Sequence, residues 1–403
     1  MNQPCVSDDL RHGRRRLATL VVVGHAVKHL YNSGLLSLLL PEIKIALGLS
    51  GAQFGSLLSA RQVTSWGTTI VSGYVGDRFA DKAPLMLGLS LGLLGVSFYV
   101  AGHVTTYWVM LIVMLLIGLG PSLFHPPALG ELTRRFPDRR GFATSLHGTG
   151  GILGEILGPL IVAVLLSVLS WRGVMQWSIF PGLIAGGVIW GMMNSVRRER
   201  REEEGAGSAQ EYFSSLLSLI RNQVVLILVI VTVMRSMADV AVAGFLPVFL
   251  RENLGFSQAM VAVYLSLSQV VGLGAQPCIG LISDHLGRKS VLIPGLLATS
   301  FLYAVLAFVD TTIALSVIVV CLGVFRFSLH QVFIAAALDA NRGQIRASVV
   351  ALIYGAGFLG TFSPYLAGLI ADAFTIRSVF LYGGVITLIA AITMTVVRLP
   401  RVS

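Results

Sequence analysis

Three side chains that can carry positive charge lie within one apolar segment near the start of the chain. His25, Lys28 and His29 fall in HAVKHLYNSG, which follows LATLVVVG and precedes LLSLLL. An amine and two imidazoles this close together can bind an anion, relay a proton or coordinate a metal ion. A charge at the middle of a bilayer costs about 2.5–3.5 kcal/mol, so such residues in an apolar segment indicate a function.

Eight further polar side chains interrupt apolar segments elsewhere. They are three cations, two acids and three histidines: Arg61, Arg235, Arg326, Glu155, Asp239, His125, His147 and His330. Arg235 and Asp239 share a helix face at i, i+4, as do Arg326 and His330. With neutral histidines, four cations against two acids leave an excess of positive charge, which predicts an interior that binds anions.

The elements that must position these residues are membrane-spanning helices. Of the 403 residues, 55% are hydrophobic and only 12% are charged, about half the charge of a soluble protein. Apolar windows long enough to cross a bilayer recur twelve times. They cover residues 17–40, 51–75, 83–103, 107–132, 142–169, 173–193, 223–249, 257–281, 290–309, 312–338, 346–374 and 378–397. The sequence therefore predicts an all-α polytopic membrane protein.

The distribution of basic residues predicts the topology. Of 29 Lys and Arg residues, 21 fall in the tails and in alternate loops, while the opposite loops hold Lys44, Arg172, Arg251 and Arg377. This asymmetry places both termini in the cytoplasm of a cell carrying the protein in its inner membrane. The net charge of +10 follows from topology, and the lack of a contiguous basic face argues against nucleic acid as a partner.

The chain consists of two halves with one plan. A mixed-charge segment divides it, and we predict a first six-helix bundle over 1–194, a cytoplasmic linker over 195–222 and a second bundle over 223–403. GYVGDRFADK after the second span recurs as GLISDHLGRK after the eighth. Lys28 and Arg235 each precede the Asp of that motif by the same distance. Two pseudo-symmetric halves are typical of secondary transporters, whose site lies at the membrane midplane.

GLISDHLGRK resembles the loop motif of the major facilitator superfamily, and the resemblance covers the chain. GHAVKHLYNSGLLSLLLPEIKIALGLS, GLGPSLFHPPALGEL and RGFATSLHGTGGILGEILGPL are similar to the fosmidomycin-resistance branch of its efflux carriers. The resemblance implies twelve helices in the major facilitator fold. It also implies a cytoplasmic gate, in which an Asp of each motif caps a neighbouring helix. The residues concerned are Gly73, Asp77, Arg78, Gly280, Asp284, Gly287 and Arg288. The first motif departs at Ala80 and Asp81. Lys28-His29 replaces the Asn-Asp pair usual in that branch.

We expect Lys28 and Arg235 to hold the substrate, with further contacts from Arg61, Arg326, His29, Tyr31, Tyr354 and Phe358. Proton coupling is assigned to Glu155, Asp239, His25, His125 and His330. Glu155 either carries a proton or pairs with one of the four cations, and the sequence favours neither. The fifth span is rich in glycine, which we interpret as close helix packing.

Several other ligand classes are not expected. The four membrane cations would repel a divalent metal, and Cys5, Cys278 and Cys321 are too scattered for a thiolate site. No phosphate-binding GxxxxGK[ST] loop is present, and we expect no cofactor. The partners that we expect are a small anion, protons and the lipid bilayer, for a monomeric protein.

The sequence thus predicts a secondary active transporter that moves a small organic or phosphonate-type anion by alternating access, through proton-coupled efflux. An importer, symporter or uniporter of such an anion is the first alternative. A carrier of metal or metal chelate, a membrane-embedded enzyme and a transporter-like receptor are weaker ones. The chain shows none of the familiar nucleophile or metal motifs that an enzyme would need.

Overall fold

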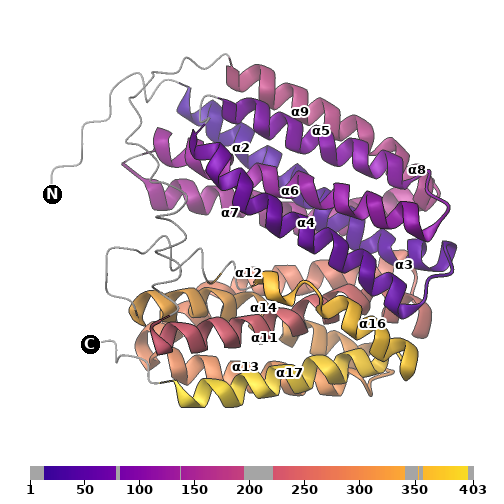
Figure 1. Cartoon of the computed structure of the whole chain (residues 1–403), viewed down its shortest axis with the longest axis vertical. Helices are drawn as coiled ribbons and strands as arrows, with labels where there is room; N and C mark the ends of the chain where they lie inside the picture. Colours follow the sequence, from indigo (N-terminus) through magenta and orange to yellow (C-terminus); the bar gives the residue numbers. More distant parts are fainter. Residues whose placement is uncertain are drawn as a thin grey trace. The chain divides into compact units, whose positions relative to one another are not determined.

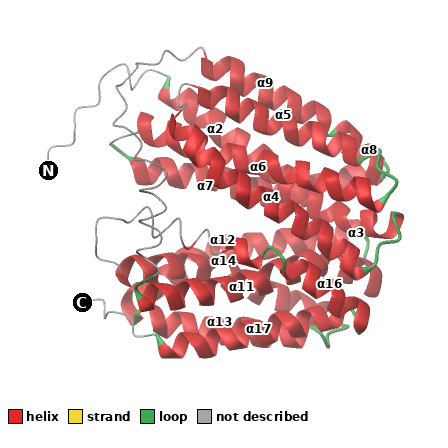
Figure 2. Cartoon of the chain, viewed as in Figure 1, coloured by secondary structure: helices red, strands yellow, loops and turns green. Residues whose placement is uncertain are grey.

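The protein, described here by a computed structural model, consists of helices joined by short loops in the residues that the structure describes. These are residues 13–78, 82–136, 138–194, 221–340, 353 and 357–397. None of them belongs to a β-strand (Figure 2). The prediction of an all-α membrane protein is therefore confirmed, because long apolar helices satisfy their own backbone hydrogen bonds in lipid.

The first six predicted spans are formed by the helices α2 to α9 (Figure 1). Their bounds are α2 Arg14–His29, η1 Leu30–Leu35, α3 Leu36–Ala46, α4 Gly51–Arg78, α5 Ala83–Ala101, α6 Tyr107–Arg135, α7 Arg140–Leu166, α8 Trp171–Trp177 and α9 Ile179–Asn194. The π-helical turn η1 begins directly after Lys28 and His29. Such turns inside longer helices often mark functional sites.

The last six spans are formed by the helices α11 to α17. Their bounds are α11 Gln223–Val248, η3 Phe249–Asn253, α12 Gln258–Leu286, α13 Arg288–Leu306, α14 Thr312–Ala340, η4 Gly357–Gly360, α16 Ser363–Ala373 and α17 Arg377–Val396. The α11 helix is capped by the preceding residue Asn222, whose side chain accepts a hydrogen bond from the backbone N–H of Val224 at 3.0 Å. An Asn at this position satisfies backbone donors that the first helical turn leaves free.

Nine helices in the described residues are long and apolar enough to cross a membrane. The other three of the twelve predicted spans are not among these nine helices, and the sequence and the described residues show why. The first carries His25, Lys28 and His29, and the second carries Arg61, which lower their hydropathy. The eleventh lies partly outside the described residues, which include α16 but not 354–356.

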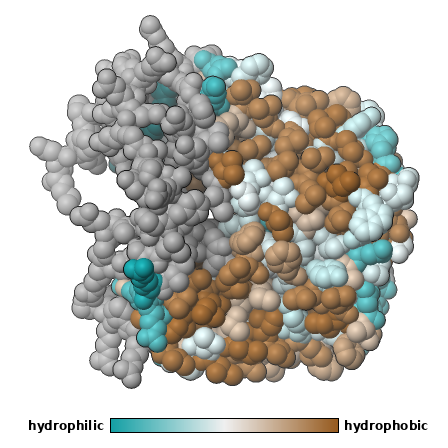
Figure 3. Space-filling model, in the orientation of Figure 1, coloured by the Kyte–Doolittle hydropathy of each residue, from teal (hydrophilic) through white to brown (hydrophobic). Residues whose placement is uncertain are grey.

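Large apolar side chains are exposed along the helices, as expected for contact with lipid. Trp108, Ile112, Val164 and Ile313 are examples, and Ile313 is 81% exposed. Figure 3 shows one face on which hydrophobic side chains predominate. Soluble monomers rarely expose a contiguous apolar patch of more than a few hundred Å².

The chain divides into two compact units of contacting residues. One contains Met1–Ile43 and Ala60–Ala206, and the other contains Lys44–Ser59 and Gly207–Ser403. Residues 195–220 of the predicted linker lie outside the described residues, and residues 221 and 222 directly precede α11. The predicted bundle boundaries at 194 and 223 stay predictions.

Glycines of α7 bring this helix against the first span in the first unit. A methyl group on Gly150 would lie 2.4 Å from the carbonyl oxygen of Val22, and one on Gly154 would lie 2.2 Å from that of Ala26. One on Gly158 would meet the Cα of Gly34 at 2.7 Å. These three glycines follow one another at every fourth residue and form one helix face. They permit the close backbone approach that small residues give membrane helices.

We expect Gly154→Ala to destabilise the protein by about 1–3 kcal/mol, because the carbonyl of Ala26 cannot yield as a flexible side chain would. Gly148→Ala on the same helix is the matched control. Nothing lies within 4 Å of its added methyl group, and alanine favours the helix by up to about 1 kcal/mol. Thermal unfolding in detergent compares the two. Equal stability of both variants would show that α7 does not pack this closely.

The loop between α12 and α13 contains the second copy of the loop motif. Gly287 has a φ of 90°, which favours glycine and disfavours the alanine found at the matching position 80. Asp284 accepts a hydrogen bond from Arg288, whose Nε also donates to Asp339 at 2.9 Å. The expected capping of a neighbouring helix by Asp284 stays a prediction. The side chains of Gly73, Asp77 and Arg78 lie outside those described.

Candidate functional site

Six polar side chains gather inside the first unit, and we call them the Lys28 network. The α2 helix supplies His25, Lys28 and His29, which fall on one face at i, i+3 and i+4. The α6 helix supplies His125, and α7 supplies His147 and Glu155. Both α6 and α7 pack on α2. The network therefore depends on the glycine contacts that hold α7 against the first span.

Lys28 lies at the centre of the network and is 2% exposed. Its Nζ lies 2.6 Å from Nε2 of His125 and 3.1 Å from Nε2 of His29. No carboxylate among the described residues forms an ion pair with it. The direct partners of this buried amine are therefore imidazoles, and the carboxylate of Glu155 acts on its positive charge only through space.

Glu155 pairs with a histidine of the network. Its Oε1 lies 2.9 Å from Nδ1 of His29, and the hydroxyl of Ser33 donates to the same oxygen at 3.4 Å. The sequence left open whether Glu155 carries a proton or pairs with one of the four cations. Its described partner is His29, a group that is cationic only when protonated.

Three histidines of the network offer nitrogen atoms within 4.8 Å of one another, namely His25, His125 and His147. However, the rings of His25 and His147 are stacked with centroids 3.7 Å apart and planes 8° apart. Metal-binding lone pairs lie in the ring plane, so two stacked rings direct them along parallel lines and not at a common ion. Since Lys28 also contacts His125, the arrangement suits a hydrogen-bond network better than a metal site.

Arg61 of α4 is a second cation of the first unit. Its Nη2 donates to Oδ1 of Asn32 in η1, and its Nε is buried without a hydrogen-bond acceptor among the described residues. Asn32 is a neutral acceptor. As with Lys28, no described carboxylate pairs with this guanidinium.

One cation of the second unit, Arg235, pairs directly with a carboxylate. Arg235 donates from Nη1 to Asp239 one helical turn later, which confirms the intrahelical ion pair expected from their spacing. The hydroxyl of Tyr303 on α13 donates to the other oxygen of Asp239 at 2.6 Å. Nη2 of Arg235 lies 3.3 Å from Nδ1 of His330 on α14. His330 thus contacts Arg235, and no contact with Arg326 is described for it.

The two units repeat one contact between a cation and a histidine. Lys28 in the first span contacts His125 in the fourth, and Arg235 in the seventh contacts His330 in the tenth. The sequence predicts that Lys28 and Arg235 occupy equivalent positions in the two halves. The structure adds that each of these two cations contacts a histidine of its own unit.

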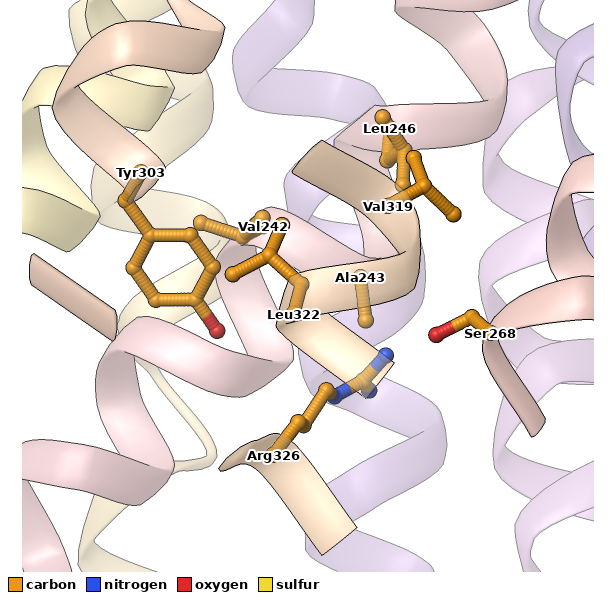
Figure 4. Close-up of a pocket in the computed structure, with 8 residues that line it drawn as sticks. All are labelled: Val242, Ala243, Leu246, Ser268, Tyr303, Val319, Leu322 and Arg326. Atoms are coloured by element: carbon orange, nitrogen blue, oxygen red, sulfur yellow. The ribbon is translucent and has the colours of Figure 1, made fainter. Parts of the chain in front are cut away.

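Arg326 of α14 extends into a small cavity of the second unit (Figure 4). Tyr303 and Ser268 supply the other polar groups, and the remaining walls are the apolar side chains of Val242, Ala243, Leu246, Val319 and Leu322. The guanidinium of Arg326 forms no hydrogen bond or ion pair within the described part of the chain. Its recorded contact is with the ring of Phe327, 5.5 Å from Cζ to the centroid.

The three aromatic residues expected to contact the substrate lie in different environments. Tyr31 is fully buried and its hydroxyl donates to the carbonyl of Ser178, which indicates a packing role. Phe358 is 39% exposed, while Tyr354 lies outside the described residues. Sequence reasoning did not assign Tyr303 or His147 to the site. His147 was visible as one more histidine of an apolar segment, whereas nothing in the sequence marks the tyrosine that reaches Asp239.

Comparison with known proteins identifies the class to which this fold and these buried charges belong. The family model for the Major Facilitator Superfamily matches residues 26–362 and 228–403. The chain belongs to the Major Facilitator Superfamily. It is therefore a membrane transporter and not an enzyme, with the twelve-helix fold of that family.

Individual relatives are distant in sequence but span the chain. The fosmidomycin resistance protein of Escherichia coli (strain K12) is 25% identical over 378 residues, which cover 92% of this chain and 90% of that protein. The multidrug resistance protein MdtG of Yersinia enterocolitica is 24% identical, covering 88% of this chain and 87% of its own. A crystal structure of a mutant of the nucleoside transporter NupG has a TM-score of 0.80 at 15% identity. It covers 94% of this chain and 99% of that one.

Proposed function

We propose that the protein exports a small organic anion across the inner membrane, in exchange for protons. The observation that carries this proposal is the excess of cations over carboxylates within the spans of each unit. Lys28, Arg61 and Arg326 have no carboxylate partner in the described residues, and only Arg235 forms such a pair. Unpaired cations in membrane segments are costly, and a transported anion would supply the missing partner.

The geometry of these groups suits carboxylates, phosphates or phosphonates. A guanidinium can donate two parallel hydrogen bonds to such a group, while an ammonium acts as a point charge. Lys28 and Arg235 are the principal contacts of the proposal, with Arg61, Arg326 and His29 as further ones. The name of the Escherichia coli relative adds fosmidomycin, a phosphonate, as the first substrate to test.

The proposal also specifies the direction of transport, which is efflux, and its coupling, which is exchange for protons. The relatives named for drug resistance favour export. The histidines around Lys28 and the pairs Glu155–His29 and Asp239–Arg235 are groups that could exchange protons as the substrate comes and goes. Lys and Arg are concentrated in the tails and in alternate loops, which favours an orientation with both termini in the cytoplasm.

The experiment is counterflow by the purified protein in proteoliposomes. Vesicles loaded with unlabelled fosmidomycin receive a trace of labelled fosmidomycin outside. We expect transient accumulation of the label well above that of protein-free vesicles, because a carrier exchanges the two pools. If folded protein gives no counterflow of fosmidomycin, phosphate or simple carboxylates between pH 5.5 and 8, the proposed function is wrong.

A further inference from the structure

The hydrogen-bond donors and acceptors of the Lys28 network restrict where its protons can lie. Nδ1 of His25 lies 2.6 Å from the carbonyl oxygen of His147. A carbonyl only accepts, so Nδ1 of His25 carries a proton. In a neutral His25, Nε2 is then an acceptor, and it lies 3.1 Å from Nε2 of His29.

Nε2 of His29 therefore has two competing partners. Towards His25 it must donate, whereas towards an ammonium at Lys28, 3.1 Å away, it must accept. It cannot do both at once. The network admits two arrangements that contain the same number of protons and differ in the position of one of them.

In the first arrangement Lys28 is an ammonium that donates to His29 and His125. His29 then carries its single proton on Nδ1, which lies 2.9 Å from Oε1 of Glu155 but does not have the angle of a hydrogen bond to it. In the second, the N–H bond of Lys28 breaks and its electron pair stays on Nζ. The proton forms an N–H bond with Nε2 of His29, which becomes an imidazolium paired with Glu155 and donating to His25.

The network continues on the other side of Lys28. His125 accepts from Lys28 at Nε2, so its own proton lies on Nδ1 and faces Nε2 of His147 at 3.3 Å. Nδ1 of His147 is then protonated, buried and without an acceptor in the described residues. His147 and Glu155 are eight residues apart on α7, which corresponds to about 12 Å along the helix. The network therefore extends along the direction of transport.

One other charged group, Arg61, lies close enough to Lys28 and His29 to repel positive charge on both of them. Arg61 of α4 is hydrogen-bonded to Asn32. The helices α5 and α9, which also pack on α2, contain between them one titratable side chain, Tyr99, which is 40% exposed. The charged and titratable groups that face Lys28 are thus those of the network itself and Arg61.

We propose that His147, His125, Lys28, His29 and Glu155 form a proton relay in the first unit, with Lys28 as the group at which the coupled proton and the substrate anion meet. This proposal rests on the proposed function. An anion beside Lys28 stabilises the ammonium and holds the proton there. Its departure favours transfer to His29 and Glu155, which keep the proton in the unit during the return step without substrate, as exchange of the anion for a proton requires.

The test separates exchange from proton-driven accumulation in proteoliposomes, with fosmidomycin as the probe and a trapped pH-sensitive dye. The variants Glu155→Gln and His147→Gln alter the two ends of the relay. His103→Gln is the control, because His103 is exposed and contacts Tyr99 and Gln176 instead. We expect exchange to change by less than about threefold, while accumulation driven by a pH gradient falls at least about tenfold in both relay variants.

Each other result has a defined meaning. Accumulation near the wild-type level in Glu155→Gln, or equal loss of exchange and accumulation in both relay variants, would overturn the relay. Exchange by the wild type with no proton movement would also overturn it while leaving anion transport in place. Absence of exchange by the wild type would instead overturn the proposed function.

Discussion

Lys28→Met should weaken binding of fosmidomycin by at least about tenfold, or roughly 1.4 kcal/mol, while leaving the protein folded. The variant should fold because the acid that acts on Lys28, Glu155, makes its direct contact with His29, and it should bind weakly because the proposed contact of the anion is removed. The direct contacts of Lys28 are with His29 and His125, which keep other partners in the network. Binding to the purified protein and thermal unfolding of the same sample provide the two measurements.

Lys44→Met is the matched control for this substitution. It removes the same charge, but Lys44 pairs with Glu252 at 2.8 Å at the end of its helix, where an ion pair contributes about 1 kcal/mol or less. We expect this variant to bind as the wild type does. Normal binding by Lys28→Met, or a loss that merely follows unfolding, would return Lys28 to a structural role.

Arg235→Met should have the opposite profile and destabilise the protein by about 3–5 kcal/mol, because it leaves the buried carboxylate of Asp239 without its cation. The side chain of Asp239 is only 13% exposed, and the Tyr303 hydroxyl would be its remaining described donor. Adding Asp239→Asn to Arg235→Met should restore most of the stability, since an amide needs no counter-charge. Equilibrium unfolding in mixed micelles measures both variants.

The double variant separates the two roles of Arg235. If the pair only holds the unit together, the stable double variant should bind fosmidomycin normally. The proposed function expects it to fold and to bind at least about tenfold more weakly. A single variant as stable as the wild type would mean that Asp239 does not depend on Arg235.

The sequence predicted the elements of this fold and the identity of the buried charges. Long apolar segments and the positions of Lys28, Arg61, Arg235 and Arg326 within them could be recognised because both follow from composition along the chain. The pair Arg235–Asp239 was predictable from helical spacing alone. The equivalence of Lys28 with Arg235 followed from their equal distances to the repeated loop motif.

The contacts between helices could not be derived in the same way. Which face of α6 turns His125 towards Lys28 depends on helix rotation, and periodicity alone does not fix the rotation of a span that is apolar on all sides. The same ambiguity concealed that Glu155 meets His29 and that His330 meets Arg235. The sequence predicted that the glycine-rich fifth span packs closely on another helix. It did not predict that Gly150, Gly154 and Gly158 pack on the first span.

The positive interior should select for anions, and competition between compounds of different charge tests this selectivity most directly. Counterflow of labelled fosmidomycin is measured against butylphosphonate, butyltrimethylammonium and butanol, which share an apolar body and differ in charge. We predict that at matched concentrations the phosphonate competes and the ammonium compound and the alcohol do not. Competition by the ammonium compound with none by the phosphonate would contradict this selectivity.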